Sequence, residues 1–553
     1  TVTSFSDITT GSAGYVVNAT QRSATTQYNT WRSPVSFTGA SIAIMGTQTL
    51  SSTGTFTASA GDVTISGAMS DSNSGSGLTF KATGNVVVSA NVSTTNGAIT
   101  VWSDSDNTSD GGIQVTTASS ITSSGGDIVM GGGTTLATGY AKGTSTTANT
   151  GGAYAGVLIQ GSVNSAGGAL TLRGMDSSST TSGTSMGNYG AGVQVEKGGS
   201  LSSGAGALTI NGALNSANTD TAKWHIGVYI GYIGTGTPSI TTTSGNISIT
   251  ADSSLKTTGV AQSQPIGIYG ASITSTSGNI TFTTTAATGT GQQFANNVAT
   301  TTISTTSGAI SITGDTSGYT SDFSMYSISG ASVTIQAYKP TFTSTTITSA
   351  GAVVIESPGT AFGAAVTSSG LTISGSPSSV RIGKTTNTAD VTVAGALTAT
   401  GNINVYGGSI ALGANITVSG AGNDVMLKGT NHVYETAAVT IQTNGGDVVF
   451  WSDSDATSGG ATGTYAGSSI NTVNGDTTRT STGGGSIYIG GGTASATNSA
   501  GTTYPTGASS ITGSNTSPVP ICGFESGASG SATSLTTYYT GGGTFSAKST
   551  SSY

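Results

Sequence analysis

The chain repeats a short phrase in which a polar pair and Gly precede apolar residues that alternate with polar ones. Clear copies are TSGNISIT at 243–250, TSGNITFT at 276–283 and TSGAISIT at 306–313, and looser ones are SAGGALTL at 165–172, SGAGALTI at 203–210 and SGGDIVMG at 124–131. Alternation with a period of two is typical of a half-buried strand, and Gly before it indicates a turn. Because the phrase returns every few tens of residues, the sequence predicts a repeat architecture.

The phrase is the last part of a longer block that holds three short apolar clusters. In 156–174 the clusters are VLI, then V, then L and L two residues apart, and 192–212 and 267–283 have a related order. Corners of Gly or Ser/Thr separate the clusters. We therefore predict an all-β fold: a right-handed parallel β-helix, or β-solenoid, with rungs of about 20–25 residues and Ser/Thr/Gly-rich loops. Each rung would bury its inward Val, Ile and Leu against the neighbouring rungs.

An array of antiparallel sandwich domains is the alternative architecture. It predicts hairpin dipeptides at regular intervals and units of about a hundred residues joined by linkers. Asn96–Gly97 and Asn211–Gly212 are among the few such dipeptides, which favours the solenoid. The segments 134–155 and 176–191, almost pure Ser, Thr, Gly and Ala, are interpreted as loops at one edge.

A second, longer repeat overlies the first. NGAITVWSDSDNTSDGG at 96–112 matches NGGDVVFWSDSDATSGG at 444–460, so that Trp102 corresponds to Trp451. We expect one continuous solenoid over residues 1–553, with large copies that start near 96 and 445. Since the chain starts at Thr1 without Met and the second copy is still running near its end, we also expect it to be a segment of a longer repeat protein.

Composition excludes several classes of protein. Gly accounts for 87 of 553 residues, but 34% of residues are hydrophobic and only 7% are charged, which disfavours disorder. The net charge of −8 argues against nucleic acid as a partner. No apolar run reaches the ~18 residues that a membrane span needs. Cys522 is the only cysteine, so one chain can form neither a disulfide nor a thiolate metal site.

The densest group of acidic residues is the candidate metal site. Asp104, Asp106 and Asp110 in SDSDNTSDGG alternate before Gly, as the oxygen ligands of a Ca²⁺ loop do. The second copy keeps Asp453 and Asp455 but has Gly459 in place of the third acid. Calcium binding is one interpretation, and a solvated acidic corner is the other.

Nothing in the sequence indicates catalysis, and we predict neither catalytic nor cofactor-binding residues. A glycan-cleaving site needs acids and bases gathered in one cleft. Asp104 with Asp106 is the only dense carboxylate pair, while His225 and His432 lie in the unrelated contexts WHIG and NHVY. The histidines are interpreted as surface or packing residues, and the tryptophans as packing residues rather than sugar-stacking platforms.

The blocks resemble a known family of repeats. GVLIQGSVNSAGGALTLRG at 156–174 and ASITSTSGNITFT at 271–283 resemble the repeats of filamentous-haemagglutinin-like proteins, the very large secreted adhesins of Gram-negative bacteria. The resemblance implies a right-handed β-helical shaft that is exported and displayed on, or released from, the cell surface.

We therefore expect an extracellular structural shaft that mediates attachment, cell–cell contact or formation of a matrix or biofilm. Its expected partners are further copies of itself, joined end to end or laterally, and surface glycans or other cells. A carbohydrate-binding or polysaccharide-cleaving β-helix is the alternative. An ice-binding solenoid is a minor alternative, because it would need the same Thr-x-Thr pair on one face of every rung.

Overall fold

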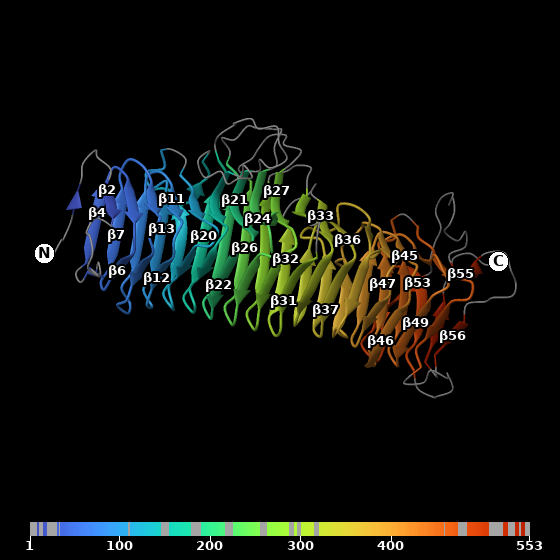
Figure 1. Ribbon diagram of the computed structural model, residues 1–553. Helices are drawn as coiled ribbons and strands as arrows, with labels where there is room; N and C mark the ends of the chain where they lie inside the picture. The colour runs from blue at the N-terminus through green and yellow to red at the C-terminus, as the bar shows by residue number, and fades with distance from the viewer. Residues whose placement is uncertain are drawn as a thin grey trace. The chain divides into compact units, whose positions relative to one another are not determined.

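The computed structural model is all-β: its described residues form strands and contain no helix (Figure 1). It describes residues 8–9, 15–18, 30–31, 34–108, 111–144, 154–177, 190–215, 225–254, 263–286, 292–295, 300–314, 320–457, 459–473, 484–507, 524–528, 537–540 and 543–547. Among these residues, none belongs to a helix long and apolar enough to cross a membrane.

The chain divides into two compact units. The first comprises residues 1–309 and 314–319, and the second comprises residues 310–313 and 320–553. One continuous solenoid over the whole chain therefore stays a prediction.

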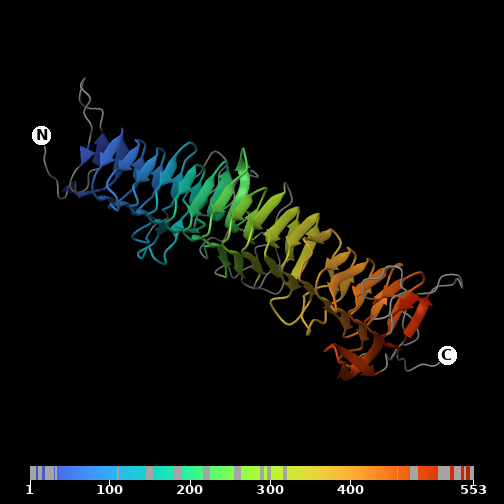
Figure 2. The same ribbon diagram turned by 90° about the horizontal axis from the view of Figure 1, so that it is seen from below.

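In the first unit the chain passes through three parallel sheets in turn. β18 (Tyr154–Ile159), β19 (Ser162–Asn164) and β20 (Leu170–Met175) are followed by β21 (Gly190–Lys197), β22 (Ser200–Gly204) and β23 (Leu208–Ala213). β18 pairs with β21, β19 with β22 and β20 with β23, all in parallel. Three strands thus form one repeat, and the next repeat lies against it, as the successive ranks of strands in Figure 2 show.

The strands of the first unit follow this order throughout. The first sheet contains β1 (Ile8–Thr9), β4 (Val35–Gly39), β7 (Gly54–Ala58), β10 (Leu78–Ala82), β13 (Ile99–Ser103), β16 (Ile128–Gly132), β20, β23, β26 (Ile247–Ser253) and β29 (Ile280–Ala286), with β17 (Ala141–Lys142) added beside β20. The second contains β2 (Tyr15–Asn18), β5 (Ile42–Met45), β8 (Val63–Ile65), β11 (Val86–Val88), β14 (Ile113–Val115), β18, β21, β24 (His225–Gly234), β27 (Ser263–Ile268) and β30 (Gln292–Ala295). The third contains β3 (Thr30–Trp31), β6 (Gln48–Leu50), β9 (Met69–Asp71), β12 (Val92–Thr94), β15 (Ser120–Thr122), β19, β22, β25 (Ser239–Thr242), β28 (Ser272–Ser275) and β31 (Thr301–Thr305). β32 (Ala309–Gly314) contributes residues to both units.

The second unit is built in the same way. Its first sheet contains β35 (Ser332–Gln336), β38 (Ala352–Glu356), β41 (Ser379–Ile382), β44 (Ile403–Gly407), β47 (Val425–Gly429), β50 (Val448–Ser452), β53 (Ile487–Thr497) and β57 (Phe545–Ala547). On the second side lie β33 (Thr320–Ser324), β36 (Lys339–Thr343), β39 (Val366–Thr367), β42 (Val391–Val393), β45 (Ile410–Leu412), β48 (Val433–Glu435), β51 (Thr462–Tyr465) and β55 (Phe524–Ala528). On the third lie β34 (Tyr326–Gly330), β37 (Thr345–Ser349), β40 (Leu371–Ser374), β43 (Leu397–Ala399), β46 (Ile416–Ala421), β49 (Thr440–Asn444), β52 (Ser469–Asn471) and β56 (Thr537–Tyr539). β54 (Thr503–Gly507) pairs with β53 in antiparallel fashion.

The alternating apolar pair of the phrase fills the core, as predicted. Leu208 pairs with Ile247, and Ile247 pairs with Ile280, so that equivalent residues of successive repeats stack on one another. These side chains are fully buried. The same stacking produces a row of aromatic rings near the start of the chain, in which Phe56 lies 5.4 Å from Phe37 and 5.6 Å from Phe80, measured between ring centroids.

The Gly of the phrase is required because two backbones approach closely. A Cβ atom on Gly245 would lie 1.7 Å from the carbonyl oxygen of Gly206, and one on Gly278 would lie 2.0 Å from that of Gly245. Their φ angles lie outside the left-handed region, so a positive φ is not the reason for Gly here. The column comprises Gly97, Gly126, Gly168, Gly206, Gly245, Gly278 and Gly308.

The spacer between Gly and the apolar pair also has a structural role. Asn246 Oδ1 accepts the backbone N–H of Asn279 at 2.9 Å, and Asn279 Oδ1 accepts that of Ala309 at 2.8 Å. In the second unit, Asp447 donates its N–H to Asp424 Oδ1 at 2.8 Å. An Asn or Asp at this position therefore ties its repeat to the next one through the side chain, in addition to the strand hydrogen bonds.

One part of the second sheet differs from the prediction that outward positions face water. On β18, β21 and β24, outward residues are buried as well as inward ones, and Leu158, Ala191, Ile226 and Tyr229 form a separate apolar cluster. The signal is present in part of the sequence: β18 and β24 are continuous apolar runs, which is typical of strands buried on both faces, whereas β21 alternates and places Gln194 and Glu196 at its buried outward positions.

The duplicated corners and the Lys142 pocket

The two copies of the WSDSD motif fold into the same corner, one in each unit. Trp102, near the end of β13, pairs with Gly131, and Trp451 in β50 pairs with Gly490. The indole Nε1 of Trp102 donates to the carbonyl of Gly133 at 2.7 Å, and that of Trp451 donates to the carbonyl of Gly492 at 2.8 Å. The long sequence repeat is thus also a structural repeat.

Each indole ring also lies beneath a lysine from the preceding strand of its sheet. Lys81 Nζ lies 4.2 Å from the ring centroid of Trp102, and Lys428 Nζ lies 3.9 Å from that of Trp451. Such cation–π contacts contribute about 0.5–1 kcal/mol at exposed sites and more when the ammonium is desolvated. Burial lowers the pKa of Lys428.

The corner backbones match as well. Asp104 and Asp453 have φ angles of +46° and +49°. The N–H of Asp104 donates to the carbonyl of Gly84 at 3.1 Å, and the N–H of Asp453 donates to that of Asn431 at 2.8 Å. Because Asp tolerates the left-handed region better than most residues, its choice at these corners has a backbone reason that is independent of metal binding.

The Asp104 carboxylate is buried and faces an ammonium group. Its Oδ2 lies 3.2 Å from Lys142 Nζ, and Lys142 Nζ donates to Asn107 Oδ1 at 2.6 Å. The side chain of Asp104 is 0% exposed and that of Lys142 is 22% exposed. The lysine balances the charge of a carboxylate that could not otherwise be buried cheaply.

The other predicted calcium ligands do not join Asp104. Asp106 is exposed and accepts the hydroxyl of Thr108 at 2.7 Å, and this hydrogen bond is the main reason why its pKa is lowered. Asp455 accepts the N–H of Thr457 at 3.3 Å. Asp110 lies outside the described residues. No group of three or more His, Cys, Asp or Glu side chains gathers within the part of the chain that is described, so calcium binding at either corner stays a prediction.

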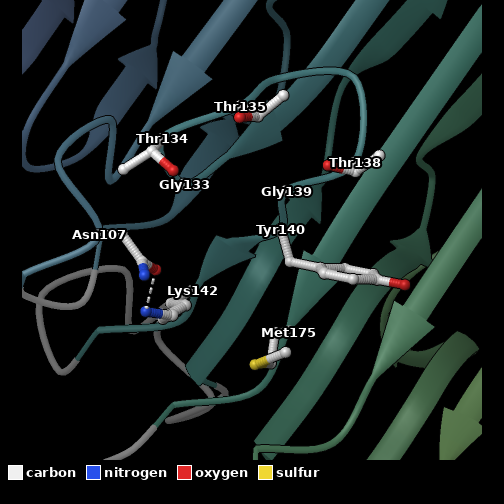
Figure 3. A pocket seen from close by; sticks show the side chains of 9 residues that line it. All are labelled: Asn107, Gly133, Thr134, Thr135, Thr138, Gly139, Tyr140, Lys142 and Met175. Atoms are coloured by element: carbon white, nitrogen blue, oxygen red, sulfur yellow. Dashed lines mark hydrogen bonds between the residues drawn. The ribbon is translucent and has the colours of Figure 1, made fainter.

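A pocket of about 220 Å³ opens beside Lys142 (Figure 3). The residues that line it are Asn107, Gly133, Thr134, Thr135, Thr138, Gly139, Tyr140, Lys142 and Met175. Most belong to the connection between β16 and β17, inside the segment 134–155 that was predicted to be a loop. The prediction is wrong for Ala141 and Lys142, which form a short strand against Gly174 and Met175 of β20. The ends of the two predicted loop segments are strand as well, because 154–155 begin β18 and 190–191 begin β21.

Hydrogen bonds hold the wall of this pocket in place. Gly133 donates its N–H to the carbonyl of Asp104 at 3.1 Å, while its own carbonyl accepts the Trp102 indole. Further along, Arg173 Nη1 donates to the carbonyl of Leu136 at 3.4 Å. Tyr140 is half-buried, and desolvation is the main reason why its pKa is raised. The pocket is therefore formed by a segment that is fixed at both ends.

The second corner has a different cover. β53 continues beyond the sheet and returns as β54, and Tyr504 of β54 stacks on Tyr488 of β53 with ring centroids 3.9 Å apart. Trp451 packs in this cluster with Val449 and Tyr488 and is only 4% exposed. Gly490 is needed beneath the hairpin, because a Cβ atom there would lie 2.8 Å from the carbonyl of Gly507.

Neither histidine lines the Lys142 pocket. His225 Nδ1 lies 2.8 Å from Asp176 Oδ2, and both side chains are buried. His432 Nδ1 accepts the N–H of Ala461 at 3.0 Å, and desolvation lowers its pKa. The His225–Asp176 pair was missed in the sequence, because its members lie 49 residues apart and no motif connects them.

Comparisons with known proteins add no relative. No protein-family model, curated protein or solved structure matches the chain.

Proposed function

We propose that the chain is a right-handed parallel β-solenoid that serves as the structural shaft of an extracellular fibre or surface adhesin, mediating attachment, cell–cell contact or matrix formation. The observation that supports it is the repeated register within each unit, where strand after strand pairs in parallel at the same inward positions. A right-handed course agrees with the strong preference of parallel crossover connections for that hand.

The physical properties of such a stack suit a shaft. Ten strands of the first sheet, spaced at about 4.8 Å, extend the first unit over roughly 40 Å. Cohesion comes from backbone hydrogen bonds and from a core that every repeat shares with its neighbours, so stiffness does not depend on disulfides. Because only 7% of the residues are charged, there is little electrostatic repulsion between copies that join end to end or laterally.

The function can be tested by displaying the chain on a non-adherent bacterial cell. We expect cells that display the chain to aggregate, attach to host cells or build a matrix. Cells that display an unrelated β-solenoid of equal length should do none of these. Electron microscopy of the purified chain should show rods whose width is the cross-section of a single rung. Displayed chains that form rods but confer no attachment, contact or matrix would contradict the proposed role.

The alternative, a carbohydrate-binding or polysaccharide-cleaving β-helix, is favoured by one observation, the Lys142 pocket. Cleavage by paired carboxylates needs one acid and one base on the two sides of a bond. The Asp104 carboxylate forms an ion pair with Lys142, and the Asp106 carboxylate accepts a hydrogen bond from Thr108, so the two do not act as such a pair. We therefore propose a non-enzymatic protein in which this pocket is a binding site.

The ice-binding alternative finds little support in the register. Thr209, Ser248 and Thr281 occupy one outward position of successive first-sheet strands, but the next outward position holds Asn211, Thr250 and Thr283. A flat array would need the same Thr pair in each of these strands.

A further inference from the structure

We propose that the Lys142 pocket binds one neutral, hydroxyl-rich ring, the chemistry of a single uncharged sugar unit. The inference extends the proposed function, since a displayed shaft would meet such rings on surface glycans.

The wall of the pocket is held by hydrogen bonds within the chain. This wall is bound to the sheet through Trp102 and the backbone of Asp104, and Leu136 is held by Arg173. A binding site that needs no ordering loses less conformational entropy on association. This matters for a ligand as small as one ring, because it offers few contacts to offset such a cost.

The charged groups around the pocket are of both signs and nearly balance one another. The charge of the Lys142 ammonium is balanced by the buried carboxylate of Asp104. The exposed carboxyl of Asp106 adds a further negative charge, since the hydrogen bond from Thr108, with a smaller contribution from the Lys142 charge, lowers its pKa. Arg173, which donates to the carbonyl of Leu136, and Asp252 add one charge of each sign that acts on Tyr140. An anionic ligand would therefore meet a site with no net positive charge, and a neutral ligand loses nothing by lacking a charge.

The polar groups at the pocket match a ligand that carries several hydroxyls. Thr134, Thr135 and Thr138 each contribute a hydroxyl that can donate and accept. Of the three N–H groups of Lys142, one is directed to Asn107 and another faces Asp104; among the described residues no further acceptor takes the third, which can donate to a ligand oxygen.

The remaining lining supplies apolar contact. Figure 3 shows the thioether of Met175 on the side of the pocket opposite Thr134 and Thr135, with Tyr140 beside it. Sugar rings present C–H groups between their hydroxyls, which pack on such surfaces. The volume of about 220 Å³ is below the ~300–1,000 Å³ of pockets for drug-sized ligands, so it suits a single ring.

The test is a titration of the full chain with glucose, galactose, N-acetylglucosamine and maltotriose. Saturation-transfer NMR and calorimetry measure the binding. We expect at least one of these probes to bind with a Kd of about 1 mM, as a few weak contacts allow. Glucuronic acid, N-acetylneuraminic acid, inorganic phosphate and Ca²⁺ should bind at least tenfold more weakly.

Two variants place the binding at the pocket. Thr138→Val keeps the side-chain shape but removes a hydroxyl, and Asn107→Gly removes the amide where φ is +56° and Gly is well tolerated. Each should raise the Kd about three- to tenfold, as expected for one hydrogen bond. Thr209→Val, on the outward face of β23, is the matched control and should leave the Kd unchanged.

The outcomes of these experiments separate the pocket from the adhesive role. No binding of any neutral probe, tighter binding of a charged one, or a Kd that both variants leave unchanged would overturn the proposal. Saccharide binding by a chain that confers no attachment when displayed would overturn only the adhesive role. Attachment without saccharide binding would overturn only the pocket.

Discussion

Gly245 lies directly against the carbonyl oxygen of Gly206, the equivalent residue one repeat earlier, with room for a hydrogen but not for a Cβ atom, which would stand 1.7 Å from that oxygen. The contact recurs between Gly278 and Gly245 at 2.0 Å. The glycine that announces each phrase is thus a place where two backbones touch, and its replacement has consequences that can be measured.

Gly245→Ala should destabilise the first unit by about 2–4 kcal/mol, because the new methyl group must push apart two repeats that are joined on both sides. Urea unfolding of the full chain, followed by circular dichroism, measures the change. Gly359→Ala is the control, since its Cβ would meet only side-chain atoms at 3.7 and 4.0 Å. Equal stability of the two variants would show that the repeats yield at the column.

Glu435 should make the second unit sensitive to pH. It is 7% exposed in β48, its Oε2 accepts the N–H of Tyr465 at 2.7 Å, and desolvation is the main reason why its pKa is raised to about 7. A folded-state pKa above the unfolded value of 4.5 means that folding favours the protonated acid. The loss of folding stability due to Glu435 is absent below pH 4.5, because the acid is then protonated in both states. It grows as the pH rises to about 7 and reaches roughly 3 kcal/mol above that.

The matching variant is Glu435→Gln, which keeps the shape and cannot ionise. The unfolding free energy of the variant should not decline between pH 4.5 and 7 as that of the wild type does. At pH 8 it should exceed that of the wild type. Thermal unfolding at a series of pH values gives both curves. Parallel curves for the two proteins would rule out Glu435 as the source.

Lys142→Met should destabilise the first corner, because it leaves the Asp104 carboxylate buried without its cation. Fully buried pairs lose about 3–5 kcal/mol on such a change, and the partial exposure of Lys142 reduces the expected loss to about 2 kcal/mol. Asp104→Asn combined with Lys142→Met should recover much of it. A double-mutant cycle measures the coupling, and additive effects of the two substitutions would mean that the pair is not coupled.

The two tryptophans should respond unequally to truncation. Trp451 is 4% exposed beneath the β53–β54 hairpin, whereas Trp102 is half-buried. Trp451→Ala should cost about 3–4 kcal/mol and free the hairpin, and Trp102→Ala should cost about half as much. Hydrogen exchange at residues 487–507 reports the hairpin directly. Unchanged protection there in Trp451→Ala would show that the indole does not hold it.

Much of the fold could be predicted because it depends on neighbouring residues. The alternation in ISIT at 247–250 assigns Ile247 and Ile249 to one face of a strand whatever the strand packs against. The buried outward cluster at Leu158 and Tyr229 was missed although its continuous apolar runs are visible, because alternation elsewhere in the chain suggested a single buried face.

The candidate site could be predicted only in part. The duplicated corners at Trp102 and Trp451 follow from the long repeat, but the partner of Asp104 does not. Lys142 lies 38 residues further along, in a segment of small polar residues whose path no local pattern determines. Alternating acids therefore suggested a cation, and the fold supplies an ammonium from the same chain.

The amino-acid sequence was enough to predict the strands, their inward residues and the glycines between them, because side-chain alternation is visible within one repeat. Which polar groups meet, such as Lys142 with Asp104 and His225 with Asp176, and the burial of Glu435 follow only from the folded chain. Those contacts join different repeats, and their energies depend on burial that exists only once the repeats have stacked.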